Sequence, residues 1–388
     1  MNKLKRILII TRYYLPDQTG GGIPRSLSTL VERLGDEFEF YILTLDRGFE
    51  NQRYPDIRTE VWQPVGKANV MYVPPDHYTP KYLRRLFRSI EYDILYLSSC
   101  FAVTTRPVLL MKKLGLIPDK PTILAPRGEF SKGALRLEGY KKRPYLWLSK
   151  RIGFYDHIIW HACSEREKED ILTIMASRWP LNVIVASEFV ADSPNVPVSL
   201  RIKKKNHARI VFLSRISRMK NLDYALRLLS RLSGTVEFDI YGPLEDLAYW
   251  QECQDLAEQL EQKVRIRYKG ALAPDQVFRE LRNYHLFLLP TRGENFGHVI
   301  LEAMSVGCPV LISDQTPWHN LEDKKAGWAI PLTQPERFVT ILQDLLAMEE
   351  AEFREWEKGA SDYAREITNN PSVIESNRML FGGALACH

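Results

Sequence analysis

The stretch that decides the fold runs from Leu286 to Ile312 and reads LFLLPTRGENFGHVILEAMSVGCPVLI. Leu286–Pro290 is a short apolar run that ends in a proline, which predicts a buried strand. The polar segment Thr291–Gly297 predicts a loop, and the apolar segment His298–Val306 predicts a buried helix that a glycine and a proline end. Pro309–Ile312 then begins another buried strand. This order of elements predicts a parallel sheet covered by helices.

Two carboxylates stand out in this stretch. Glu302 is the only residue with a formal charge between His298 and Ile312, and Glu294 lies eight positions before it in the predicted loop. A carboxylate in an apolar helix is costly to bury unless it is paired, so Glu302 is either capped by a neighbour or part of a site. The loop lies at the C-terminal edge of a strand and at a helix N-terminus, where open α/β sheets bind ligands and helices favour phosphate.

The run Glu294-Asn295-Phe296-Gly297 followed by Glu302 resembles the E-x7-E signature of the retaining glycosyltransferases of family 4, which have the GT-B fold. The resemblance covers most of the chain. Ile210–Arg215 with Met219-Lys220-Asn221 is similar to the strand and loop that hold the donor diphosphate. Further similar segments are Phe238–Gly242 and Val264–Gly270, which resemble the next two strands, and Ile7–Tyr14 with Gly20-Gly21-Gly22, which resembles the first strand and its glycine-rich loop.

The resemblance implies a role for each matching residue. Glu294 would hold hydroxyl groups of the donor sugar near the reacting carbon, and Glu302 would hold the ribose. If the whole span between them were helical, the two would lie about 12 Å apart along the axis. The catalytic residues implied are Glu294, Arg215 and Lys220. The donor-binding residues implied are Gly21, Gly22, Arg215, Lys220, Gly242, Asn295, Phe296, Gly297, His298 and Glu302.

Leaving-group stabilisation in such a site needs positive charge. Arg215 can fork two phosphate oxygens while Lys220 acts as a point charge, and the amides of Asn295, Phe296 and Gly297 can add to them. We therefore expect no metal and no cofactor; the donor, a UDP-sugar by its frequency in the family, is a substrate. The alternative is that both cations are surface charges beside a helix capped by Asn221.

One element departs from the family pattern. Many relatives carry a histidine near the donor sugar in the first domain, where this chain has Pro126-Arg127-Gly128-Glu129. Arg127 is a candidate for a phosphate or acceptor contact and Glu129 for an acceptor base, or the two form a salt bridge that shapes the loop. We interpret His161, on a strand-like run, as a core or edge histidine.

The 388 residues suit two domains. We predict an α/β GT-B protein with two doubly wound Rossmann-like domains, residues 1–190 and 207–365, facing each other across a cleft. Residues 366–388 would form a helix that crosses back to the first domain, and Asp192–Pro197 with Lys203–Asn206 would form the linker. The predicted strands are Arg6–Thr11, Phe38–Leu45, Ile94–Ser98, Thr122–Ala125, His157–Cys163, Val183–Ala186, Arg209–Leu213, Glu237–Tyr241, Val264–Tyr268, Leu286–Leu289 and Pro309–Ile312.

The composition points to the cytosol. Five scattered cysteines lack any C-x2-C pair, which favours reduced thiols over disulfides or a zinc site. The apolar run Ile7–Ile10 is too short for a signal sequence, and no stretch approaches the roughly 20 apolar residues of a membrane span.

The net charge of +5 is concentrated between Lys132 and Arg151, where seven basic residues meet a single acid, Glu138. Aromatic residues interleave with them. This run is either a solvated helix face or a surface that meets anionic lipid headgroups or a phosphorylated lipid acceptor. No recognition module accompanies it, so we expect no nucleic-acid partner.

Taken together, the resemblance implies a retaining, metal-independent glycosyltransferase that moves a sugar from a nucleotide sugar to a glycan or lipid-linked glycan in polysaccharide or glycolipid synthesis. It would act in the cytoplasm, peripheral to the inner membrane face. A nucleotide-sugar epimerase of the same architecture is the alternative, although its acid and base groups cannot be placed. A non-enzymatic sensor would be expected to lack Glu294 or Lys220, and both are present.

Overall fold

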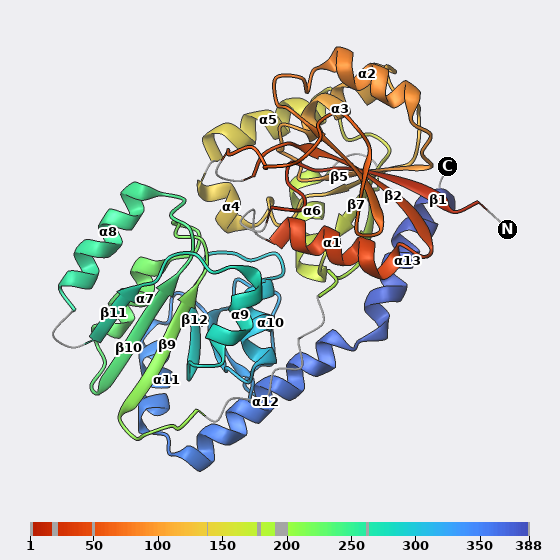
Figure 1. The fold of residues 1–388 in the computed structure, drawn as a ribbon. Helices are drawn as coiled ribbons and strands as arrows, with labels where there is room; N and C mark the ends of the chain where they lie inside the picture. Colours follow the sequence, from red (N-terminus) through yellow and green to blue (C-terminus); the bar gives the residue numbers. More distant parts are fainter. Residues whose placement is uncertain are drawn as a thin grey trace. The chain divides into compact units, whose positions relative to one another are not determined.

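The computed structural model describes residues 3–17, 22–48, 51–137, 139–176, 180–190, 201–260 and 264–386. They form two compact units, one of Met1–Ala191 with Pro371–His388 and one of Asp192–Asn370 (Figure 1). The fold class is α/β, as predicted. The predicted linker segment Asp192–Pro197 lies outside the described residues. Lys203, in contrast, is 3% exposed and donates to the carbonyls of Leu346 and Met348, so this lysine is part of the second unit and the linker prediction was wrong for it.

The first unit is built on a sheet with the order β3-β4-β2-β1-β5-β6-β7-β8, in which only β3 is antiparallel to its neighbour. Its strands are β1 (Lys5–Ile10), β2 (Phe38–Leu45), β3 (Gln63–Val65), β4 (Ala68–Val73), β5 (Ile94–Ser98), β6 (Thr122–Ala125), β7 (Ile158–Ala162) and β8 (Asn182–Val185). Its helices are α1 (Gly22–Leu34), α2 (Pro80–Ser89), α3 (Thr105–Lys113), α4 (Lys132–Leu137), α5 (Gly139–Arg151), α6 (Glu165–Met175) and α13 (Pro371–Ala386).

Alternate residues of each central strand enter different cores, because successive side chains point to opposite faces. Leu8 and Ile10 of β1 pack with α2, α3, α5 and α6, whereas Ile7 and Ile9 pack with α1 and α13. From α13, Phe381 lies against Phe38 and Phe40 of β2, at ring-centroid distances of 5.3 and 6.1 Å. The blue helix α13 in Figure 1 thus belongs to the same unit as the red strand β1.

The second unit has a fully parallel sheet with the order β11-β10-β9-β12-β13-β14. Its strands are β9 (His207–Leu213), β10 (Thr235–Tyr241), β11 (Val264–Tyr268), β12 (Leu286–Leu289), β13 (Val310–Ser313) and β14 (Gly327–Ile330). Its helices are α7 (Leu222–Leu229), α8 (Leu247–Glu258), α9 (Pro274–Leu281), α10 (His298–Ser305), α11 (Pro335–Ala347) and α12 (Glu350–Thr368). Each unit therefore contains one doubly wound sheet and is Rossmann-like, as predicted.

Three strands were not predicted, namely β3, β4 and β14. β14 is only four residues long, and its first residue is Gly327, which weakens the strand pattern. Glycine is nevertheless required there, because a Cβ atom would lie 2.0 Å from the carbonyl oxygen of Val310 on β13. Within the described part of the chain, no helix is both long enough and apolar enough to span a bilayer.

Candidate functional site

The topology of the second sheet brings two of the predicted loops together. The chain leaves β9 toward β10 on one side, while β12 pairs with β9 on the other, with Leu286 opposite Ile210. The strand order therefore reverses between β9 and β12, and ligands bind at the C-terminal edge of such a switch point. The loop after β9 carries Arg215 and Lys220, and the loop after β12 carries Glu294.

Lys220 and Glu294 form a direct ion pair across this switch point. Their side chains are only 11% and 13% exposed, so water screens the pair weakly. The sequence predicted both residues for the site but not that they would contact each other. The structure thus places a cation and a carboxylate side by side at the switch point, and the two charges compensate each other.

Asn221 holds the two loops in register. It occupies the N-cap position of α7, as the alternative interpretation had it, but with a left-handed φ of 62° and without a side-chain cap hydrogen bond. Its amide instead donates to the carbonyl of Pro290 at 2.9 Å, and its Oδ1 accepts from the guanidinium of Arg292. The amide of Arg292 also donates to the carbonyl of Met219. These bonds fix the spacing from which Lys220 reaches Glu294.

The segment between Glu294 and Glu302 is only partly helical. α10 starts at His298, after Gly297 at a φ of 79°, so residues 294–297 are loop and the 12 Å separation derived from a continuous helix does not apply. The amide of Glu294 donates to the carbonyl of Gln315 at 2.9 Å. Phe296 packs between His298 and Trp318, with ring centroids 4.9 and 5.2 Å away. The turn that presents Glu294 is therefore held by this hydrogen bond and backed by aromatic rings.

Glu302 lies half-buried on α10, and its Oε2 atom is buried. The C-terminal end of the same helix is fixed by Arg201, whose side chain is fully buried. Arg201 donates to the carbonyls of Val306 and Gly307, each at 2.8 Å, and pairs with Glu357 at 2.9 Å. The orientation of α10, and with it the position of Glu302, is thus set at both ends.

Arg215 takes a different partner from Lys220. Its guanidinium pairs with Glu245 at 2.8 Å, and both side chains are about one-third exposed. Gly242 lies in the loop after the neighbouring strand β10, at a φ of 138°, and a Cβ atom there would lie 1.8 Å from the carbonyl oxygen of Ser214. Only glycine lets the β10 loop approach the β9 loop so closely. Gly242 therefore shapes the loop that carries Arg215.

In the first unit, Gly21 lies outside the described residues, and Gly22 is the exposed first residue of α1. Of the two alternatives for Arg127 and Glu129, the salt bridge between them does not form. Arg127 instead pairs with Glu188 at 2.7 Å, both side chains being at most 5% exposed. It also donates to the hydroxyls of Tyr96 (2.9 Å) and of Ser26 on α1 (3.2 Å). Arg127 ties α1 to the C-terminal edge of the sheet, and a role toward an acceptor stays a prediction.

Glu129 joins the loops that follow β5 and β6. Its carboxylate accepts hydrogen bonds from the Ser99 hydroxyl and the Cys100 amide, each at 2.6 Å, and from the Phe101 amide at 3.3 Å. Burial raises the pKa of Glu129 to about 7, although the bonds from Ser99 and Cys100 act to lower it. A carboxyl group with this pKa is suited to exchange a proton near neutral pH.

The pKa of Glu129 leads to a prediction about stability. In the unfolded chain, the carboxyl group of Glu129 loses its proton at about pH 4.3, whereas in the folded protein it keeps this proton up to about pH 7. The folded state therefore binds more protons in this window, and its free energy of unfolding falls as the pH rises through it. We expect wild type to lose stability relative to Glu129→Gln between these pH values in urea titrations. A difference that stays constant with pH would contradict the prediction.

His161 is a core histidine, as interpreted from the sequence. It is 1% exposed, and its ring contacts the Tyr96 hydroxyl and the Ala186 carbonyl, each at 2.8 Å. Burial lowers its pKa to about 4, so the imidazole is neutral in the folded protein.

Several partners of the site residues were missed from the sequence. Glu188, Glu245 and Gln315 lie far along the chain from the residues they contact, so no local pattern could identify them. In the part of the chain that the structure describes, no group of three or more His, Cys, Asp or Glu side chains lies together as a metal site would require.

Comparison with known proteins gives a family match for part of the chain and a match of the overall fold. Residues 199–363 match the family model of the glycosyl transferases group 1. No curated protein matches the chain. Among solved structures, sucrose-phosphate synthase from Thermosynechococcus elongatus is similar at a TM-score of 0.73 and 14% identity, over 99% of this chain and all of that one.

Two further structures are similar over nearly their full length. Anabaena HepE, solved with UDP and glucose, has a TM-score of 0.67 and 14% identity over 99% of this chain and 100% of that one. WaaG, a glycosyltransferase involved in lipopolysaccharide biosynthesis, has a TM-score of 0.66 and 13% identity over 96% and 98%. None of these comparisons favours the epimerase alternative. The chain has the GT-B fold, and its residues 199–363 carry the pattern of the glycosyl transferases group 1.

Proposed function

We propose that the protein is a retaining glycosyltransferase of family 4 that moves a sugar from a UDP-sugar to a glycan or lipid-linked acceptor. The observation that carries the proposal is the shielded Lys220–Glu294 ion pair at the switch point between β9 and β12, within the part of the chain that matches the group 1 glycosyl transferases. UDP as the leaving nucleotide is supported by the similar Anabaena protein, which was solved with UDP and glucose.

The ion pairs suggest how the site receives a donor. A diphosphate beside Lys220 competes with Glu294 for the ammonium group, and the released carboxylate can then accept hydrogen bonds from hydroxyl groups of the sugar. In the same way, the guanidinium of Arg215 can leave Glu245 for the diphosphate. Its planar pair of N–H donors can bind two phosphate oxygens at once. Before the donor arrives, the two acids keep the cations compensated. Asn295, Phe296, Gly297 and His298 are proposed to line the donor site beside them, and by the resemblance Gly21 and Gly22 of the first unit are proposed as further donor contacts.

In the reaction, the bond between the anomeric carbon and the phosphate oxygen breaks, and UDP leaves with the electron pair. Lys220 and Arg215 stabilise the negative charge that develops on it. The acceptor oxygen bonds to the anomeric carbon and loses its proton, and a phosphate oxygen on the same face of the sugar can take that proton. An α-linked donor should therefore give an α-linked product, whose configuration NMR of the new linkage reports.

For the acceptor, we propose a lipid-linked glycan at the cytosolic face of an anionic membrane. The basic run lies on α4 and α5, where Tyr140 and Trp147 are 75% and 64% exposed. Each basic residue near an anionic surface contributes about 1 kcal/mol, which gives salt-sensitive attachment. Co-sedimentation with anionic but not neutral liposomes at low salt tests this attachment, and equal, negligible binding to both would refute it.

Donor binding can be tested before the acceptor is known. UDP, GDP, ADP and their sugars are each added to the protein and the melting temperature is recorded. A ligand at 100 times its dissociation constant adds about 2.7 kcal/mol to the free energy of unfolding. We expect UDP and one UDP-sugar to give the largest shift. No shift with any nucleotide would defeat the proposed function.

Glu302 is proposed to hold the ribose, so Glu302→Gln is expected to weaken UDP binding several-fold, because a neutral amide is a weaker acceptor for ribose hydroxyls. Calorimetric titration with UDP measures the effect. Glu322→Gln, an exposed carboxylate of the same unit, is the matched control. Unchanged UDP affinity in Glu302→Gln would leave this residue with a structural role.

Transfer is expected to continue in EDTA, since the proposed phosphate contacts are cationic side chains and backbone amides rather than acidic metal ligands. The rate of UDP release is measured with and without the chelator. Complete loss of activity that Mg²⁺ or Mn²⁺ restores would show that a metal serves the leaving group.

A further inference from the structure

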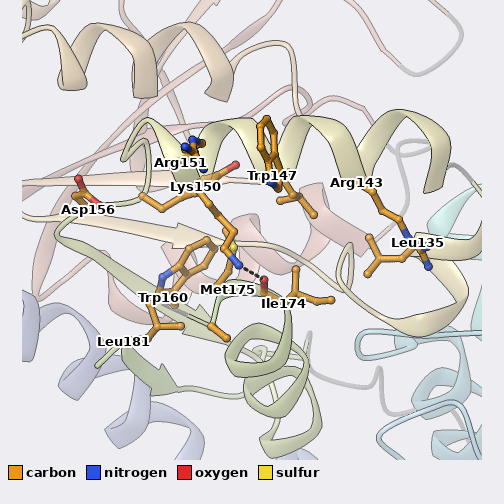
Figure 2. Close-up of a pocket in the computed structure, with 13 residues that line it drawn as sticks. Leu135, Arg143, Trp147, Lys150, Arg151, Asp156, Trp160, Ile174, Met175 and Leu181 are labelled. Atoms are coloured by element: carbon orange, nitrogen blue, oxygen red, sulfur yellow. Dashed lines mark hydrogen bonds between the residues drawn. The ribbon is translucent and has the colours of Figure 1, made fainter. Parts of the chain in front are cut away.

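Below α5 lies a pocket of about 580 Å³ that belongs to the first unit alone. Its walls come from α5, from the end of α6, from β7 and from the segment before β8 (Figure 2). The volume is within the range of small-molecule sites. None of the residues proposed for the donor site lines it.

The interior of the pocket is apolar. Trp160 of β7 is fully buried and forms its floor, and Leu146 and Met175 are also buried. Ile174 and Leu181 add aliphatic surface at the sides (Figure 2). A wall of this composition favours a hydrocarbon ligand, because water gains little from entering it.

The rim of the pocket is cationic. Arg143, Lys150 and Arg151 line it from α5, together with one acid, Asp156. Asp156 pairs with Lys113 at 3.1 Å, so its charge is already compensated. Lys150 donates one hydrogen bond to the carbonyl of Ile174 at 2.9 Å, the contact dashed in Figure 2, and an ammonium group has two further donors. The rim therefore complements an anionic headgroup.

The outer face of α5 is itself suited to a lipid surface. Trp147 and Leu148 are 64% and 52% exposed, and Ile152 just after the helix is 44% exposed. The guanidinium of Arg151 lies 5.7 Å from the ring centroid of Trp147, which places charge and aromatic surface together on α5. Aromatic and basic side chains in this combination occur where proteins meet headgroups.

We propose that this pocket binds one hydrocarbon chain of an anionic membrane lipid, whose phosphate is attracted to the positive charge that Arg143, Lys150 and Arg151 provide along α5. The inference rests on the membrane attachment put forward under the proposed function and gives it a specific site. The chain packs on Trp160, Leu146 and Met175, and Trp147 lies on α5 beside the pocket. A pocket of this kind binds a single lipid molecule through its chain and its headgroup, whereas the affinity of a basic surface alone depends only on the charge density of the membrane.

The test uses the full-length protein and dodecyl phosphate below its micelle-forming concentration, followed by titration calorimetry. Dodecyl maltoside provides the same chain with a neutral headgroup, and inorganic phosphate provides the charge without the chain. We expect saturable binding of dodecyl phosphate that is at least tenfold tighter than binding of either comparison ligand. No binding, or equal binding of the two dodecyl compounds, would overturn the proposal.

Two variants locate the binding. Leu181→Trp fills the pocket from its half-buried wall, and the double variant Arg143→Gln/Arg151→Gln removes exposed rim charge without touching the core. Each is expected to weaken dodecyl phosphate binding at least tenfold. The control is Arg84→Gln/Arg88→Gln, which removes two exposed charges from α2 of the same unit. If the control weakens binding as much as the rim variant, the site is not this pocket.

The same variants separate this inference from the proposed function. Both should keep the melting-temperature shift that a UDP-sugar causes, since the pocket lies in the first unit and the proposed phosphate contacts lie in the second. Loss of dodecyl phosphate binding with an intact UDP-sugar shift supports the pocket. A UDP-sugar shift in a wild-type protein that does not bind dodecyl phosphate would leave the glycosyltransferase standing and remove the lipid site.

Discussion

Replacing Lys220 by methionine is expected to lower the rate of UDP release at least a hundredfold. Preorganised groups that face developing charge in a dry site commonly contribute this much to turnover. Lys220 is 8% exposed, and its ammonium group is held against Glu294, so its position is fixed before any ligand binds. The variant also leaves the Glu294 carboxylate without its cation in a shielded site, which we expect to weaken donor binding as well.

A matched control lies two residues away in the same loop. Arg218 forms an exposed pair with Glu252, so Arg218→Met removes a cation of similar length without touching the Lys220–Glu294 pair. We expect this control to retain activity within twofold. Melting temperatures and circular dichroism establish that both variants are folded. Equal rates in folded Lys220→Met and Arg218→Met would remove Lys220 from the leaving-group site.

Replacing Arg201 by methionine is expected to lower the free energy of unfolding by about 3–5 kcal/mol, the usual cost of breaking a buried ion pair by removing one partner. Arg201 is fully buried, and its loss leaves the buried Glu357 carboxylate with Arg354 as its remaining cation and removes the donors to the carbonyls of Val306 and Gly307. Urea unfolding followed by circular dichroism measures the change. Because those carbonyls end α10, we also expect weaker UDP binding in the fraction that stays folded.

The control for this prediction is Arg231→Met in the same unit. Arg231 pairs with Glu336 at the surface, where both side chains are largely exposed, and such pairs contribute about 0–1 kcal/mol. If the two variants lose similar amounts of stability, the buried network does not anchor α10 in the way described.

Much of the fold followed from periodicity alone. The strand Leu286–Leu289 was predicted with its correct limits, because a proline follows it, and the helix predicted at His298–Val306 begins at His298 and ends one residue earlier, at Ser305. β14 was not predicted, because a four-residue strand that begins with glycine has no recognisable alternation of apolar and polar residues. Asn221 stands at the N-cap position of α7, as its place in the sequence suggests, yet its side-chain amide donates to the carbonyl of Pro290 instead of capping the helix. A tertiary contact replaced the local one.

The sequence indicated the individual candidate residues of the site but not which of them form pairs. Lys220 and Glu294 are 74 positions apart, and only the adjacency of β9 and β12 brings them together. For Arg127, the nearest acid in sequence was the natural candidate, whereas the fold supplies Glu188 from beyond β8. Sequence patterns identify which residues are chemically unusual, and sheet order decides which of them meet.

The return of α13 to the first unit has a consequence for synthesis on the ribosome. The second unit is continuous in the chain, so all its parts have been made by Asn370. The first unit can be completed only later in synthesis, because Leu380, Phe381 and Ala384 complete one face of its core. Until they emerge, Phe40 and Tyr96 lack their cover, and exposed apolar surface of this kind invites chaperones and aggregation. The unit whose strands are made first is therefore the last to be completed.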